Sequence, residues 1–185
     1  SLRELPQLPP GLVPLVGAQA AAALDHAHKA RDRQGRPLAV VHRDVSPHNV
    51  LVSNEGAVKL IDFGVARAAG LPGKVAYLAP EVAAGEAATP LCDQFSLGVV
   101  LWERLTGRRL YKGPSDAVTL QRAAEAKVPP PHVSPMLDPV VLRALSKAPS
   151  ARYPDCGALA RALEDVLLEI DGPTHAAELA ALVRG

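Results

Sequence analysis

A helical pattern, with apolar residues about 3.6 positions apart, recurs along most of this chain, and a strand pattern occupies one short stretch of its first half. The alanine-rich run that starts at Pro14 predicts a helix, because proline suits a first helical position, and residues 34–37 should end it. A strongly apolar helix is expected from about Asp93 to Thr106, with Gly107 as its stop. A short helix followed by a break is expected within residues 1–11, and further helices are predicted at residues 115–127, 139–147, 155–169 and 176–184.

Two short apolar runs, residues 50–52 and 58–61, flank a polar turn and predict a β-hairpin. If the pairing is centred on Glu55 and Gly56, Asn49 and Asp62 become cross-strand neighbours with Cα atoms about 4.5–5.5 Å apart. Residues 38–42 are a third strand candidate. Because strand patterns are confined to this region, the fold class is predicted to be mainly α with a small β-hairpin region.

The composition indicates a folded domain whose net charge gives no strong attraction to nucleic acid or other polyanions. Apolar residues make up 48% of the chain and charged residues 21%, which is typical of globular sequences. A net charge of +1 gives no strong field toward nucleic acid or an anionic membrane. The chain has no signal-like start and no apolar run near the ~18 residues that a membrane span needs, so we expect a cytoplasmic protein with no membrane segment in this chain.

Five other residues have ordinary interpretations. Cys92 and Cys156 are far apart and lack metal-ligand spacing, so free thiols in a reducing compartment are expected. His26 and His28 lie two positions apart on a predicted helix, point to different faces and are expected to be exposed or locally hydrogen-bonded. Trp102 is expected to fill the core.

Three oxygen-bearing side chains, those of Asp44, Asn49 and Asp62, surround the predicted hairpin. Mg²⁺ prefers one or two carboxylates together with phosphate oxygens and water, so Asn49 and Asp62 offer a partial shell that leaves room for a nucleotide. Asp44 lies where a loop could aim its carboxylate at an incoming hydroxyl. This set suits phosphoryl transfer, although Asn49 and Asp62 could instead satisfy backbone groups of the turn.

In these residues the sequence resembles the eukaryotic-type (bacterial Hanks-type) Ser/Thr protein kinases. Residues 42–44 with Asn49 match the HRDxxxxN motif, residues 62–64 match DFG, and residues 79–81 match APE. One tripeptide alone is weak evidence, but several in the family's order and at family-like separations are strong.

Two further positions extend the resemblance over nearly the whole chain. Asp93 resembles the start of the family's buried central helix, and Arg152 resembles the arginine that family members pair with the APE glutamate, here Glu81. The features around Glu81, Asp93 and Arg152 build a platform for protein substrates in the family.

The resemblance implies a role for each matched residue. Asp44 would be the catalytic base, flanked by Arg43 and Ser46 in the catalytic loop. ATP and Mg²⁺ would be the cofactors, with Asn49 and Asp62 as metal ligands and Leu51 as an apolar floor beneath the adenine. His42 and Phe63 would belong to a hydrophobic spine, and Glu81 and Arg152 would form a buried ion pair. The residues with structural roles would be His42, Phe63, Gly64, Glu81, Asp93 and Arg152.

The chain also departs from the family's pattern. Ser46 stands where Ser/Thr kinases usually carry a lysine that touches the γ-phosphate. Residues 65–78 contain no Ser or Thr, so Arg43 is expected to find no phosphate partner there, and Tyr77 is expected to be a packing residue.

No GxGxxG motif occurs in the chain, and no small lobe with its lysine-bearing strand is found. Residues 1–170 are therefore predicted to be a kinase large (C-terminal) lobe, and residues 171–185 a tail with a short helix. The missing N-terminal lobe would be required for a full ATP site, so the chain alone is expected to be inactive.

Three functions remain open. The first is ATP-dependent phosphoryl transfer to protein Ser/Thr hydroxyls, where the preference over Tyr rests on the family alone. The second is a pseudokinase or docking module, which Ser46 and the short activation segment favour. The third is a small-molecule kinase of the aminoglycoside or choline type, which has a similar catalytic Asp and Asn but lacks counterparts of the APE motif, Asp93 and Arg152.

Overall fold

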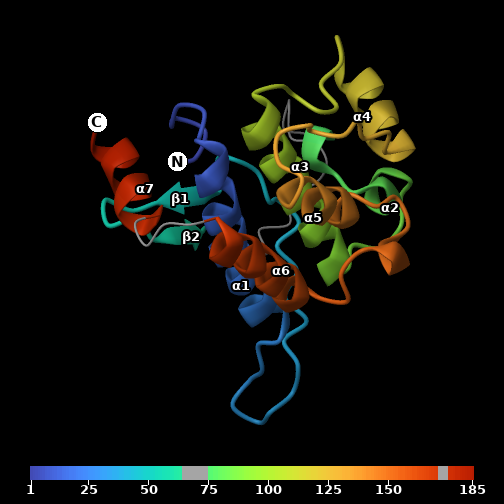
Figure 1. The fold of residues 1–185 in the computed structure, drawn as a ribbon. Coiled ribbons are helices and arrows are strands. Elements are labelled where there is room, and N and C mark those ends of the chain that lie inside the picture. Colours follow the sequence, from blue (N-terminus) through green and yellow to red (C-terminus); the bar gives the residue numbers. More distant parts are fainter. Residues whose placement is uncertain (64–74, 171–174) are drawn as a thin grey trace.

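The computed structural model describes residues 1–63, 75–170 and 175–185. Within these ranges the chain is mainly α-helical with one antiparallel two-stranded sheet, as the sequence predicts (Figure 1). The elements in order are η1 (Pro10–Leu12), α1 (Val13–His28), β1 (Val50–Val52), β2 (Val58–Leu60), η2 (Val75–Tyr77), α2 (Pro80–Ala83), α3 (Pro90–Thr106), α4 (Asp116–Glu125), α5 (Leu137–Ala144), η3 (Pro149–Ala151), α6 (Cys156–Glu169) and α7 (His175–Arg184).

Several helix ends follow from the capping residues in the sequence. Gly107 adopts a left-handed conformation with φ of 66° and ends α3. The side chain of Ser115 accepts a hydrogen bond from the backbone of Val118 at the start of α4. Asp155 accepts one from Ala158 at the start of α6. These caps explain why the predicted helices near 115–127 and 155–169 lie close to their observed positions.

Helix α1 ends at His28, earlier than the sequence pattern predicts. The following loop is closed by an isolated bridge between Arg31 and Pro37, and the Asp32 side chain accepts hydrogen bonds from the backbone of Gln34 and Arg36. Aspartate competes in this way for backbone donors that a continuing helix would use. The loop therefore extends away from the rest of the molecule (Figure 1).

The hairpin forms as predicted, but its register differs by one residue. Val50 pairs with Leu60 and Val52 with Val58, so the pairing is centred on Glu55 alone. The Ser53 backbone N–H bonds to the Ala57 carbonyl, which leaves a three-residue loop, and Gly56 in that loop takes a φ of 81°. Ile61 then lies opposite Asn49, and its N–H donates to the Asn49 carbonyl at 3.0 Å. The predicted pairing of Asn49 with Asp62 across the strands is therefore wrong.

Two other local predictions are also wrong. Residues 38–42 form no strand; the backbone N–H of His42 bonds instead to the carboxylate of Asp93 on α3. The opening residues form a turn, and the 3₁₀ helix η1 follows only at Pro10, so the short helix expected before the break is absent. Leu2 is nevertheless buried, and its N–H donates to the carbonyl of Val50 on β1.

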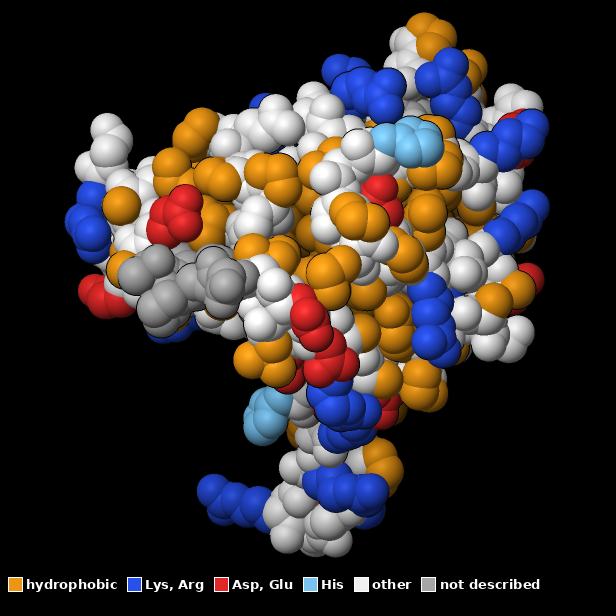
Figure 2. All heavy atoms as spheres, viewed as in Figure 1, with side chains coloured by type: hydrophobic (Ala, Val, Ile, Leu, Met, Phe, Trp, Pro, Cys, Tyr) orange, Lys and Arg blue, Asp and Glu red, His pale blue; other side chains and the backbone are white. Residues whose placement is uncertain are grey.

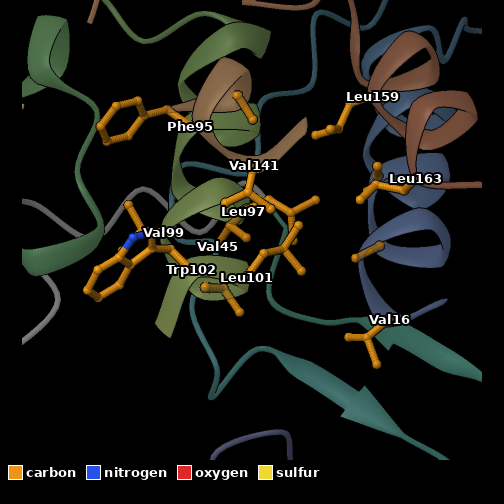
Figure 3. Packing of buried hydrophobic residues seen from close by; sticks show 14 of the residues in the cluster. Val16, Val45, Phe95, Leu97, Val99, Leu101, Trp102, Val141, Leu159 and Leu163 are labelled. Carbon is orange, nitrogen blue, oxygen red and sulfur yellow. The ribbon is translucent and has the colours of Figure 1, made fainter. Parts of the chain in front are cut away.

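The core is built around α3, which is buried along most of its length (Figure 3). Helices α1, α5 and α6 pack around it, and α1 and α6 lie side by side. Gly17 permits this close packing, since a Cβ there would lie 2.9 Å from Leu163 on α6 and 3.0 Å from Leu101 on α3. Trp102 is buried, as predicted, and its indole N–H donates to the Pro129 carbonyl.

The tail helix α7 is anchored to the start of the chain and to the hairpin. It contacts η1, and Leu179 on α7 is completely buried. Arg184 donates a hydrogen bond to the Asn54 carbonyl in the hairpin turn at 2.7 Å. Among the described residues, no helix combines the length and the apolar character needed to cross a bilayer.

Candidate functional site

The loop formed by residues 42–49 is fixed by one buried carboxylate of α3. Asp93 accepts hydrogen bonds from the backbone N–H groups of His42 at 2.7 Å and Arg43 at 2.8 Å. Arg43 has a φ of 64°, a strained conformation that costs about 1–3 kcal/mol for a residue other than glycine. Because hydrogen bonds to charged groups contribute about 1.5–3 kcal/mol, the Asp93 carboxylate can hold this turn in place.

His28 supports the same carboxylate from α1, which the sequence analysis missed. Its Nε2 atom lies 2.8 Å from Asp93 Oδ2, and both side chains are buried. The expectation that His28 is exposed or locally bonded is therefore wrong, whereas His26 is exposed. The available signal was its position four residues after Leu24, on the buried face of α1.

Asp44 and Asn49, the predicted base and metal ligand, lie in direct contact. The Asn49 side-chain nitrogen donates to the Asp44 carbonyl at 2.8 Å and to the Asp44 carboxylate at 2.9 Å. Because the Asn49 side chain is buried and donates to the half-buried Asp44 carboxylate, it fixes the orientation of that carboxylate. None of the hydrogen bonds in the described part of the chain uses the Asn49 amide oxygen, so this oxygen can serve as a ligand.

Asp62 follows β2 and is solvent-exposed. Its φ of 63° turns the chain directly after Ile61, where the hairpin pairing ends. The hydrogen bonds described bring Asn49 to Asp44 and not to Asp62, so the pairing of Asn49 with Asp62 as joint metal ligands stays a prediction.

His42 and Phe63 are in contact, as expected for members of one hydrophobic spine. Their ring centroids are 4.4 Å apart with the planes inclined at 48°. The ring of His42 is buried, and its Nδ1 lies 3.3 Å from the Asp44 backbone nitrogen. The contact therefore links the first residue of the loop 42–49 to the DFG-like motif, whose Gly64 lies outside the described residues.

Ser46 is buried, and its hydroxyl has no hydrogen-bond partner among the described residues. Leu51 is half-buried on β1, and the Arg43 side chain is exposed.

Within the segment 65–78, only residues 75–78 are described. The expectation that Arg43 finds no phosphate partner in this segment therefore falls largely outside the described residues. Tyr77 is buried, as predicted, and its hydroxyl donates to Glu103 at 2.9 Å.

The predicted ion pair between Glu81 and Arg152 is present and buried. Two hydrogen bonds of 2.7 Å join the guanidinium to the carboxylate, and the Arg152 side chain is 0% exposed and the Glu81 side chain 7%. Arg152 also donates to the Leu91 and Ser146 carbonyls and lies over the Phe95 ring. This pair fixes the APE-like segment of α2 to the start of α3.

The donor set fits magnesium bound together with a nucleotide. An amide oxygen from Asn49 and a carboxylate from Asp62 are hard ligands of the type Mg²⁺ prefers. In the part of the chain that is described, no three His, Cys, Asp or Glu side chains gather as a metal cluster. A site completed by phosphate oxygens and water needs no such cluster, since Mg²⁺ commonly uses only one or two carboxylates.

Comparison with protein families matches the protein kinase domain over residues 7–162. Among curated proteins, the chain is 36% identical over 180 residues to the tyrosine-protein kinase MasK of Myxococcus xanthus, an alignment that covers 90% of this chain and 28% of the relative. It is 41% identical over 152 residues to the serine/threonine-protein kinase PknB of Mycolicibacterium smegmatis, covering 74% of this chain and 23% of the relative. For PknB of Mycobacterium tuberculosis the identity is 37% over 166 residues, covering 81% of this chain and 25% of the relative.

Proposed function

Since the chain belongs to the protein kinase family, we propose that it forms the large lobe of a protein serine/threonine kinase that uses ATP in the cytoplasm. Residues 1–170 constitute this lobe and residues 171–185 its tail. The observation that carries the proposal is the orientation of the Asp44 carboxylate by Asn49, on a loop whose backbone is held by Asp93.

Each residue of the site has a part in this reaction. Asp44 accepts the proton of the substrate hydroxyl, and its fixed orientation keeps the carboxylate in reach of that proton. The Asn49 amide oxygen and the Asp62 carboxylate would hold Mg²⁺, while Leu51 would lie beneath the adenine. When bound, ATP would supply the phosphoryl group and Mg²⁺ would neutralise the negative charge that develops on it.

A protein substrate is supported by how the segment around the APE-like motif is held. The Glu81–Arg152 ion pair fixes α2, and the Tyr77 hydroxyl fixes η2 to Glu103 on α3. These contacts make a rigid surface beside the catalytic loop. A small-molecule kinase has no need of such a surface, since its acceptor is enclosed by the pocket.

A pseudokinase is the second candidate, and Ser46 is the observation that favours it. A lysine at this position would give a charge-assisted hydrogen bond, whose loss costs about 1.5–3 kcal/mol, or roughly ten- to 150-fold in rate. The buried Ser46 hydroxyl cannot replace that charge. Phosphoryl transfer must therefore be measured directly.

We also propose that activity requires a glycine-rich loop and a lysine supplied from outside this chain, as in the family's small lobe. The sequence contains no GxGxxG motif. Without these groups the phosphates would be exposed to water, where preorganised charges lose most of their effect.

The test measures transfer of labelled phosphate from Mg²⁺–ATP to a generic protein substrate. The 185-residue chain is compared with a longer protein that includes any residues encoded ahead of Ser1. Only the longer protein should be active, and Asp44→Asn should lower its rate by about 10²–10⁴-fold. Asp165→Asn, at an exposed position of α6, is the matched control and should leave the rate unchanged.

Two results would overturn the proposal. Equal background rates in the longer protein and its Asp44→Asn variant would indicate a pseudokinase. Transfer to small alcohols such as choline or an aminoglycoside, with none to protein, would indicate a small-molecule kinase.

A further inference from the structure

A cavity of about 820 Å³ lies between the catalytic loop, the first residues of the chain and the region that joins α3 to α4. The catalytic loop contributes Ser46, Pro47 and His48 to its lining. The backbone N–H of Arg3 bonds to the Pro47 carbonyl at 3.1 Å, which ties one wall to the loop.

The lining of this cavity carries an excess of positive charge. Its two acidic side chains are Glu103 and Asp116. Around α4, in the view of Figure 2, Lys and Arg side chains gather at the surface. The basic side chains that line the cavity are Arg3, Arg104, Arg108, Arg109 and Lys112.

The carboxylate of Glu103 is already occupied. It accepts hydrogen bonds from Arg109 Nε at 2.9 Å, from the Tyr77 hydroxyl at 2.9 Å and from the Leu110 backbone at 3.1 Å. A buried carboxylate with three donors has little capacity to bind a basic side chain of a ligand. Glu103 is therefore ion-paired with Arg109 and leaves, among the described residues, the other four basic side chains of the lining without a carboxylate partner.

Four of the basic side chains lack a carboxylate partner. Within the described ranges, Arg3, Arg104, Arg108 and Lys112 form no ion pair. Among the described residues, the Arg104 guanidinium has the Leu5 carbonyl as its single hydrogen-bond acceptor, at 3.4 Å, and burial lowers the pKa of this guanidinium. A partly buried cation in this situation is stabilised by an incoming anion.

The cavity also lies next to the reacting centre. Ser46, whose buried hydroxyl has no partner among the described residues, is part of the lining and follows Asp44 by two positions. Because an extended chain spans at most about 3.3–3.6 Å per residue, the Cα atoms of Ser46 and Asp44 lie within about 7 Å of each other. A peptide whose hydroxyl reaches Asp44 can thus place a neighbouring side chain in the cavity.

We propose that this cavity binds Asp or Glu side chains of the substrate protein, at positions within about four residues of the phosphorylated hydroxyl. The inference rests on the proposed kinase function and names its substrate class. Nucleic acid is a poorer fit, because bases bind by stacking on exposed aromatic rings, and Tyr77 in the lining is covered by Arg109 at 5.2 Å.

The test uses the 185-residue chain and measures peptide binding, which requires no phosphoryl transfer. Three fluorescent peptides carry the same central serine and differ only in flanking Glu, Gln or Lys residues. By fluorescence anisotropy at low salt, the Glu peptide should bind at least about tenfold more tightly than either other peptide. The difference should shrink as salt is added, because exposed charges are screened.

A pair of double variants assigns the effect to the cavity. Arg108→Glu with Lys112→Glu should abolish the preference for the Glu peptide. The charge-matched control, Arg33→Glu with Arg161→Glu, alters exposed residues outside the cavity lining and should keep it. Equal binding of the three peptides, tighter binding of the Lys peptide, or loss of preference in the control would overturn the inference.

The two proposals fail separately. If the chain binds the Glu peptide selectively but the longer protein transfers no phosphate, the cavity's preference for acidic side chains stands, while the kinase proposal and the assignment of the peptide as its substrate fail. If the longer protein phosphorylates the Lys peptide best, the kinase proposal stands and the cavity inference fails. A single-stranded DNA that outcompetes the Glu peptide would also overturn the inference.

Discussion

Single buried polar residues hold the site of this protein together. Asp93 joins three segments that are distant in sequence, through His28 on α1 and the backbone of His42 and Arg43. Arg152 joins α2 to the residues before α6 in the same way. In each case a charged group is removed from water and satisfied by partners that a substitution would strand.

Arg152→Ala should destabilise the fold by about 3–5 kcal/mol, because the Glu81 carboxylate would remain buried without its partner. Chemical denaturation followed by circular dichroism measures this loss. Arg161→Ala, at an exposed position of α6, is the control and should change the unfolding free energy by less than about 0.5 kcal/mol. Superimposable unfolding curves for the wild type and Arg152→Ala would contradict the prediction.

His28→Ala should cost about 1–3 kcal/mol, because Asp93 loses a buried hydrogen-bond partner. The loop that contains Asp44 should also become more mobile, with faster amide hydrogen exchange at His42 and Arg43. His26→Ala alters an exposed histidine of the same helix and should do neither. Unchanged exchange at these two amides in His28→Ala would show that Asp93 holds the loop without help from α1.

At the scale of elements, caps and turns decide where helices and strands end. The glycine, serine and aspartate caps of α3, α4 and α6 are local signals. Gly107 was recognised from sequence as the end of α3, and the predicted helices at 115–127 and 155–169 begin at the residues that cap α4 and α6. The end of α1 and the register of the hairpin were not predicted correctly from the sequence. Asp32 offered the backbone a competing set of acceptors, and a single-residue change in loop length shifts every pair of a hairpin.

The first turns of α3 and α6 bury the two free thiols, and this predicts their reactivity. Burial, with Asp93 nearby, raises the pKa of Cys92 to about 12, and burial also raises the pKa of Cys156. Neither thiol should react with an alkylating reagent at pH 8 until the protein unfolds, since the thiolate is the reactive form. An Ala22→Cys variant, exposed on α1, should react in the folded protein.

The same shifts give a pH dependence of stability. A group whose pKa is raised by folding contributes its full stability below the unfolded value, here 9.0, and loses that contribution as the pH rises toward the folded value. The unfolding free energy should therefore fall between pH 9 and about 12. A constant denaturation midpoint across this range would contradict the burial of the thiols.

For the molecule as a whole, the tail is part of the folded unit. Leu179 of α7 is completely buried, and Arg184 contacts the hairpin turn. The C-terminal tail thus packs against the start of the chain and against the hairpin, which lies between the candidate metal ligands Asn49 and Asp62.

Leu179→Ala should destabilise the protein by about 2–5 kcal/mol, the usual cost of deleting a buried leucine side chain. Leu168→Ala is the matched control, because Leu168 is 84% exposed and its truncation leaves no cavity. Thermal unfolding of both variants provides the comparison. Equal melting temperatures for the two variants would indicate that α7 does not pack against the core.

The sequence by itself determined the mainly α fold class, the hairpin, most helices and the family to which the chain belongs. Periodicity, caps and ordered motifs are local signals, and each can be read within a short window. It also predicted the Glu81–Arg152 pair, through the resemblance.

Only the tertiary structure decided which side chains meet. It paired Asn49 with Asp44, brought His28 to Asp93, and gathered basic residues of two segments distant in sequence, Arg3 and residues 104–112, around one cavity beside the loop that carries Asp44. Such contacts depend on how distant elements pack in three dimensions. A one-residue change in register or an earlier helix end, neither of which a local pattern resolves, is enough to alter them.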